Sequence, residues 1–208
     1  MVAIFHKSFH DSRRTALWLS IGFGLYAILV VAFFPAFKDQ AGEFQKLIDS
    51  YPESVLAMFY GGDVKELDMA EPGSFVQTEF GSYSVLILGA IAISQAFNAF
   101  TNAERDGSLD MLLSLPVSRR RYLLGRVLNT AAVMALVLLA CLVGFLVSRL
   151  LWPEFDVSVP NLALSMVGGW LFVMVVASYS YLLAVIVPSS RHFAGAIAYL
   201  LLIGSFLV

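Results

Sequence analysis

The sequence predicts an all-α protein, a polytopic bundle of membrane helices. Only 13% of its 208 residues are charged and 59% are apolar, whereas about 25% of residues are charged in a typical soluble domain. The mean hydropathy is +0.81. The charged residues also gather in a few segments between long uncharged runs. A soluble fold could not bury so many apolar side chains, so we expect these runs to cross a membrane as helices.

Residues 1–14 predict an amphipathic helix that lies in the membrane interface. Phe5 and Phe9 are four residues apart, and basic and polar side chains surround them. Aromatic side chains bury in such an interface while basic side chains meet lipid headgroups. A frayed basic tail is the alternative. His6 and His10 have metal-ligand spacing, but no third ligand is near them in the sequence, so we expect a solvated face.

Five uncharged runs predict membrane-spanning helices. The first, 15–37, has 23 residues, which gives about 34 Å of helix against a hydrocarbon core of about 30 Å. It is longer than the apolar part of a cleavable signal peptide, about 7 to 15 residues. The other runs are 80–103, 127–148, 162–187 and 193–208. The last has 16 residues, about 24 Å of helix, so we expect the chain to stop within its fifth span.

The segment 38–79 carries nine acidic residues and three lysines, and we expect it to lie outside the cell. Its apolar residues follow helical spacing on both sides of Pro52. This pattern predicts two short amphipathic helices on the outer membrane surface, with their apolar faces covering the bundle.

A polar stripe runs along the second predicted span. Ser94, Gln95 and Asn98 recur at helical intervals toward its cytoplasmic end. Polar side chains inside a membrane helix face protein or water and not lipid. The stripe is therefore either a substrate-facing or dimer-facing wall, or a set of interhelical hydrogen bonds worth about 1 kcal/mol each.

The distribution of basic residues predicts the orientation in the membrane, since short cytoplasmic segments carry the excess of Lys and Arg. With the N-terminus in the cytoplasm, the inner segments hold nine basic residues and the outer segments four. The nine are Lys7, Arg13, Arg14, Arg105, Arg119, Arg120, Arg121, Arg126 and Arg191. We expect six of them to hold the membrane boundary through headgroup contacts. These are Arg13, Arg14, Arg119, Arg120, Arg121 and Arg126.

The loop 104–126 is the most densely charged segment between two apolar runs, and this orientation makes it cytoplasmic. Ser108 can cap a short helix, which must end before Pro116 because a residue that precedes proline avoids the α region. The helix presents three leucines, Leu109, Leu112 and Leu113, on one face. A helix of two turns is not stable alone in water, so these leucines must pack against the bundle or a partner. Ser118 can cap the next helix.

The loop resembles that of the permease subunits of type-2 ATP-binding-cassette transporters. The family pattern is Glu-x-x-Gly-Ser/Thr-Leu-x-x-Leu-Leu-x-x-Pro-Val/Ile-Ser/Thr-Arg. The sequence matches it at every position, with Glu104, Gly107, Ser108, Leu109, Leu112, Leu113, Pro116, Val117, Ser118 and Arg119.

The resemblance implies that the loop docks as a coupling helix on a separate cytoplasmic ATPase, whose ATP-driven closure moves the spanning helices. The docking residues would be Glu104, Gly107, Ser108, Leu109, Leu112, Leu113 and Pro116. It also implies a six-span fold and a second permease, identical or different. We expect an exporter in the plasma membrane of a prokaryote, in contact with lipids and not with nucleic acid.

The chain itself shows no sign of catalysis. It has no Gly-x-x-x-x-Gly-Lys-Ser/Thr motif to hold ATP phosphates. An intramembrane enzyme built on Glu104 and His192 is a weak alternative, because the sequence has neither HExxH nor Gly-x-Ser-x-Gly. The single cysteine, Cys141, excludes an intramolecular disulfide and has no metal-ligand spacing. We therefore expect no catalytic residue, cofactor or metal. A scaffold or membrane sensor without transport is the other alternative.

Overall fold

The computed structural model describes residues 2–50, 71–105, 118–186 and 191–207. Within these ranges the chain forms helices and no strands, so the all-α prediction is confirmed. Four helices are long and apolar enough to cross a membrane, and the apolar part of the last helix, Gly195–Ser205, is shorter. Large apolar side chains cover the outside of the bundle, and Trp18, for example, is 71% exposed. This is the surface that lipid would contact.

Helix α1, Val2–Asp49, is a single helix of 48 residues. We expected a separate interfacial helix over 1–14 and another short helix after residue 38, but both segments continue the spanning helix. No glycine or proline lies between His10 and Leu19 to break it, and Pro35 lies inside the helix. Membrane helices tolerate such a proline because neighbouring helices satisfy the freed backbone groups. The location of residues 1–14 in the interface remains a prediction.

The second span begins earlier than the sequence predicted. Helix α3, Pro72–Phe75, is followed directly by the π-helical segment η2, Val76–Gly81, and by helix α4, Ser82–Arg105. Proline is favoured in the first turn because its missing N–H would have no partner there. Part of the expected outer segment 38–79 therefore belongs to the helical stack. The second short helix expected in that segment lies outside the described residues.

Three helices complete the bundle: α6, Arg119–Leu151, α7, Val159–Ile186, and α8, Arg191–Leu207. Ser118 caps α6 as predicted, because its side chain accepts a hydrogen bond from the backbone N–H of Arg121 at 3.4 Å. Helix α6 extends beyond the run 127–148 at both ends, and α7 begins before the run 162–187 from which it was predicted. Polar and charged residues that flank those runs are thus part of the helices.

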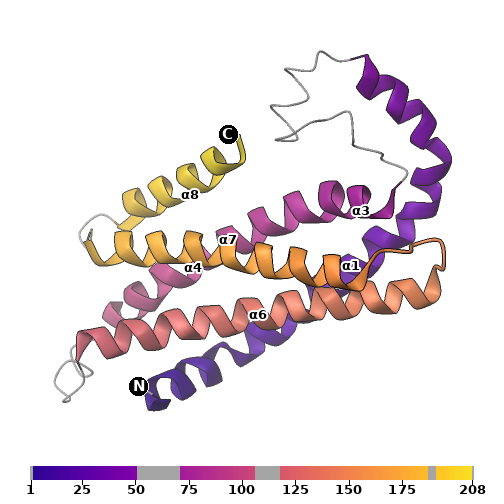
Figure 1. Ribbon diagram of the computed structural model, residues 1–208. Coiled ribbons are helices and arrows are strands. Elements are labelled where there is room, and N and C mark those ends of the chain that lie inside the picture. The colour runs from indigo at the N-terminus through magenta and orange to yellow at the C-terminus, as the bar shows by residue number, and fades with distance from the viewer. Residues whose placement is uncertain (1, 51–70, 106–117, 187–190, 208) are drawn as a thin grey trace.

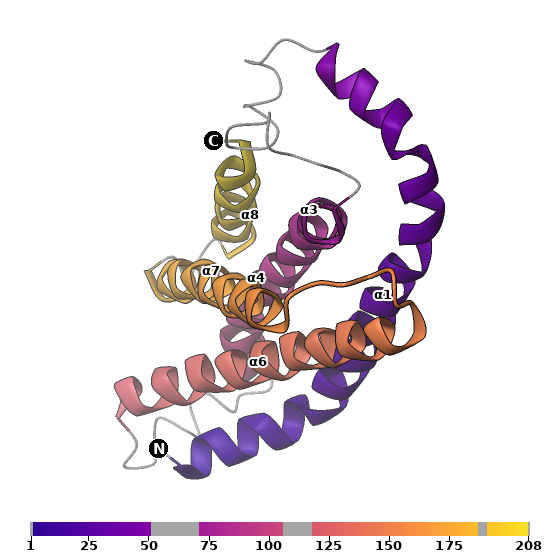
Figure 2. The same cartoon turned by 45° about the vertical axis from the view of Figure 1, so that its right-hand side comes forward.

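The helices pack as two pairs with α8 on one side. Helix α1 lies along α6, α4 packs on α7, and α8 contacts both α4 and α7 (Figure 1). Figure 2 shows the C-terminal part of α1 leaving the bundle. The α1–α6 crossing is very close, because a Cβ atom added to Gly144 would lie 2.5 Å from the backbone oxygen of Gly24. Small residues at membrane helix interfaces permit such an approach.

An aromatic core fills the end of the bundle where α1, η2 and α6 meet the loop before α7. Phe80 and Phe145 make an edge contact with ring centroids 4.8 Å apart. The ring centroids of Phe34 and Phe155 are 5.9 Å apart. All four side chains are buried. The opposite end of the bundle is held by polar contacts, and it is the end from which the loop 106–117 leaves.

Candidate functional site

The predicted polar stripe of α4 is divided between two directions. Ser94 and Asn98 are exposed, and the Asn98 side chain donates a hydrogen bond to the Ser94 hydroxyl at 3.2 Å. Gln95 points into the bundle instead, where its side-chain oxygen accepts a hydrogen bond from Thr130 of α6 at 3.1 Å. Consecutive helical residues differ by about 100°, so Gln95 cannot share the outward face of Ser94. For Gln95, the interpretation as an interhelical hydrogen bond is the one the structure supports.

Gln95, which is half-buried, belongs to a group of polar side chains that we call the polar clamp: Gln95 of α4, Thr130 of α6 and Tyr181 of α7. The Thr130 and Tyr181 hydroxyl oxygens lie 2.9 Å apart, and the Tyr181 hydroxyl is 3.2 Å from the backbone oxygen of Arg126. Thr130 and Tyr181 are almost completely buried. The clamp therefore joins three helices that are distant in sequence.

The polar clamp has more hydrogen-bond contacts than hydroxyl protons. Its three contacts join Thr130 to Gln95, Thr130 to Tyr181, and Tyr181 to the Arg126 carbonyl. A hydroxyl group has only one proton to donate, and two hydroxyls supply two. If Thr130 donates its proton to Gln95, the single hydroxyl proton of Tyr181 can go either to the Thr130 oxygen or to the Arg126 carbonyl, but not to both. While Gln95 accepts from Thr130, the three contacts therefore cannot all be hydrogen bonds at once.

A second set of contacts joins the two ends of the predicted coupling loop. The Tyr122 hydroxyl, near the start of α6, donates to the backbone oxygen of Ala99, near the end of α4, at 3.1 Å. The side chain of Arg126 donates to the same hydroxyl at 3.2 Å, and its guanidinium carbon lies 5.4 Å from the Tyr122 ring centroid. Arg126 was predicted to hold the membrane boundary, which stays a prediction; in the structure it supports the helix junction.

The other predicted boundary residues are more exposed. Arg13 and Arg14 of α1 and Arg120 and Arg121 of α6 are all exposed. Arg119 begins α6, and its side chain lies outside the description. Exposed arginines at one end of an apolar bundle suit headgroup contact, although that contact stays a prediction.

Helix α1 joins the polar end of the bundle through Asn129 of α6. The Asn129 side-chain nitrogen donates to the Ser12 hydroxyl at 3.0 Å. Its side-chain oxygen is buried and has no hydrogen-bond partner among the described residues. All four spanning helices therefore contribute to one polar region beside the predicted coupling loop.

Most of the predicted docking residues lie outside the described part of the chain. These are Gly107, Ser108, Leu109, Leu112, Leu113 and Pro116. Glu104 lies in the last turn of α4, and its side chain is outside the description. Among the described residues, no group of three His, Cys, Asp or Glu side chains could hold a metal ion.

The sequence interpretation missed Tyr122, Thr130 and Tyr181. The available signal was their polarity, since Thr130 and Tyr181 are polar residues within mostly apolar spans. Such residues usually face the interior of the bundle. Their pairing with Gln95 depends on which helices are neighbours, and a sequence without a topology does not give that.

The long apolar helices, the apolar outer surface and the interior polar bonds define a multi-pass integral membrane protein. The family model described as ABC-2 family transporter protein matches residues 2–208. The chain therefore belongs to this family of ATP-binding-cassette transporter permeases. No curated protein and no solved structure matches the chain.

Proposed function

We propose that the chain is the membrane-spanning subunit of an ATP-binding-cassette exporter, in which a separate cytoplasmic ATPase drives substrate translocation. The observation that carries this proposal is the attachment of the loop between α4 and α6. Its sequence matches the family's coupling-loop pattern, and Tyr122 bonds its two flanking helices together at Ala99. A force applied to the loop would therefore move both flanks as one body.

The polar clamp extends this body to the third helix of the bundle. Tyr181 of α7 contacts Thr130 and the Arg126 carbonyl of α6, and Thr130 contacts Gln95 of α4. Rearrangement of these bonds accompanies the change between inward-facing and outward-facing states. Packed interfaces with two discrete arrangements are how small displacements become conformational changes.

The exposed pair Ser94 and Asn98 supports a second permease beside this one. Both side chains lie on the outer face of a spanning helix, and polar side chains at that depth rarely face lipid. This face of α4 lines the substrate path or the contact with the second permease. The chain sits in the plasma membrane with its N-terminus in the cytoplasm, as the nine inner basic residues favour.

Copurification with an ATPase tests the proposal. The tagged full chain is coexpressed with a candidate ATP-binding-cassette ATPase from the same genome, and the purified complex is assayed for ATP hydrolysis in lipid nanodiscs. We expect a stable complex whose hydrolysis rate differs from that of the ATPase alone. A chain that inserts correctly but neither binds that ATPase nor changes its rate would support the scaffold or sensor alternative.

A further inference from the structure

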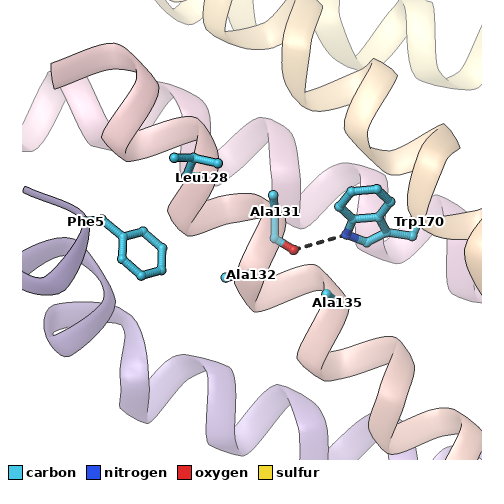
Figure 3. Close-up of a pocket in the computed structure, with 6 residues that line it drawn as sticks. All are labelled: Phe5, Leu128, Ala131, Ala132, Ala135 and Trp170. Carbon is cyan, nitrogen blue, oxygen red and sulfur yellow. Dashed lines mark hydrogen bonds between the residues drawn. The ribbon is translucent and has the colours of Figure 1, made fainter. Parts of the chain in front are cut away.

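The outer face of α6 carries a shallow apolar groove that the transport proposal does not use. The groove has a volume of about 360 Å³. Its lining residues are Phe5, Leu128, Ala131, Ala132, Ala135 and Trp170. Figure 3 shows Phe5 of α1 and Trp170 of α7 on opposite sides of the α6 alanines, so that two aromatic rings flank a floor of small residues.

The groove offers its occupant almost only hydrocarbon contact. Trp170 carries the one polar side-chain group among the six lining residues, and its indole N–H already donates to the Ala131 carbonyl at 3.1 Å. Leu128 and Ala135 are exposed, while Ala131 and Ala132 are half-buried. A ligand that needed polar contacts would find no free side-chain donor here. An aliphatic chain would contact the alanine floor and both rings.

One basic residue on the face of α6 that carries the groove favours a negatively charged headgroup. Arg121 is exposed and lies seven residues before Leu128, which places it on the same face of α6. Lys7 is also exposed on α1, but it projects about 160° away from Phe5 around the helix and so does not contribute to this face. Asp11, the acid nearest to Phe5 along α1, projects about 120° away from it around the helix. The end of the groove toward Arg121 is therefore basic.

The distance from Arg121 to the far end of the groove is comparable with the thickness of one membrane leaflet. Ala135 lies 14 residues beyond Arg121, about 21 Å along the helix. One leaflet has about 15 Å of hydrocarbon, and the long side chain of Arg121 can extend toward the headgroups. A phosphate at Arg121 and an acyl chain reaching Ala135 would fit this distance.

We propose that this groove binds one anionic phospholipid from the leaflet at the N-terminal end of α6, with an acyl chain against the alanines and its phosphate at Arg121. The lipid would fill the junction of α1, α6 and α7. Lipid binding at this groove requires only that the chain spans a membrane, so its test is independent of the transport proposal.

Quenching of Trp170 fluorescence tests the site directly. In a chain carrying Trp18→Phe and Trp152→Phe, Trp170 is the only tryptophan. The full chain is reconstituted in vesicles containing either brominated phosphatidylglycerol or brominated phosphatidylcholine. One arginine near a membrane surface strengthens anionic lipid binding about fivefold. We expect phosphatidylglycerol to quench at about one fifth the mole fraction that phosphatidylcholine requires.

Two arginine variants test whether Arg121 causes the preference for phosphatidylglycerol. Arg121→Gln should abolish the preference for phosphatidylglycerol, whereas Arg14→Gln should preserve it, because Arg14 is exposed on the side of α1 opposite Phe5. Equal quenching by both lipids in the chain with Arg121 would overturn the proposal. Protection of Trp170 from both lipids would also overturn it, since a second copy of the chain would then cover the groove.

Native mass spectrometry of the chain with its tryptophans unchanged provides a second measurement. We expect one phosphatidylglycerol to remain bound after detergent extraction, and Ala132→Phe to displace it by filling the groove. Val175→Phe is the matched control, because Val175 is exposed on α7 and is not a lining residue. Equal retention in Ala132→Phe and the control would contradict an acyl chain on the alanine floor.

Discussion

At the residue scale, the polar side chains of the spans are divided between interior bonds and an outward face. Gln95, Thr130 and Tyr181 satisfy one another inside the bundle, where an unpaired polar group would cost several kcal/mol. Ser94 and Asn98 bond to each other and remain exposed. The two sets therefore have different surroundings, although the sequence presents Ser94, Gln95 and Asn98 as one stripe.

Removal of the Tyr181 hydroxyl should destabilise the bundle modestly. Tyr181→Phe deletes the contacts to Thr130 and to the Arg126 carbonyl. Hydrogen bonds between membrane helices contribute about 0.6 kcal/mol on average and about 1.7 kcal/mol at most. We expect a loss of about 1 kcal/mol in the free energy of unfolding, measured by denaturant titration in detergent micelles.

Tyr83→Phe is the control for this loss, because Tyr83 is exposed on α4. Its unfolding curve should superimpose on that of the unchanged chain. If Tyr181→Phe and Tyr83→Phe unfold alike, the polar clamp does not stabilise the bundle.

At the element scale, the crossing of α1 and α6 depends on glycine. A side chain at Gly144 would meet the Gly24 backbone oxygen at 2.5 Å, and a side chain at Gly24 would meet the Ala140 oxygen at 3.2 Å. The neighbouring atoms belong to the backbone and cannot rotate away. The two helices must therefore separate if either residue gains a side chain.

Gly144→Ala should weaken this crossing. Overpacking a close interface costs about 1 to 3 kcal/mol, which exceeds the gain of less than 1 kcal/mol in helix propensity. Thermal unfolding in micelles should show a lower midpoint. Gly168→Ala, where an added Cβ meets nothing within 4 Å, should not lower it. A Gly144→Ala midpoint equal to that of Gly168→Ala would show that the crossing adapts.

The sequence predicted helix type well and helix limits less well. The uncharged runs identify the spans because membrane length and backbone hydrogen bonding allow few other structures. The continuation of α1 through residue 14 and past Phe37 was missed, because a change in polarity does not itself end a helix. The groove between Phe5 and Trp170 also could not be predicted, since it depends on which helices are neighbours.

At the scale of the whole molecule, basic residues at one end should determine the orientation. Replacing Arg119, Arg120 and Arg121 together with Gln leaves six inner basic residues against four outer ones under the predicted topology. We expect part of the population to expose the loop outside. Labelling of Ser118→Cys, in a chain with Cys141→Ala, by a membrane-impermeant maleimide measures this fraction.

Arg149→Gln provides the comparison, because it removes a basic residue from the predicted outer side. This change should keep the loop inside. Unchanged labelling in the triple variant would show that these arginines do not determine the orientation.

Leu113→Asp tests most directly the proposed action of an ATPase on the bundle through the apolar face of the loop. The measurement is ATP hydrolysis by the copurified complex in nanodiscs, with Ser114→Asp as the control because it places the same charge on the opposite face of the predicted helix. We predict that Leu113→Asp inserts normally but no longer changes the hydrolysis rate, whereas Ser114→Asp still does. If the Leu113→Asp chain changes the ATP hydrolysis rate as much as the unchanged chain does, the docking role of the loop is contradicted.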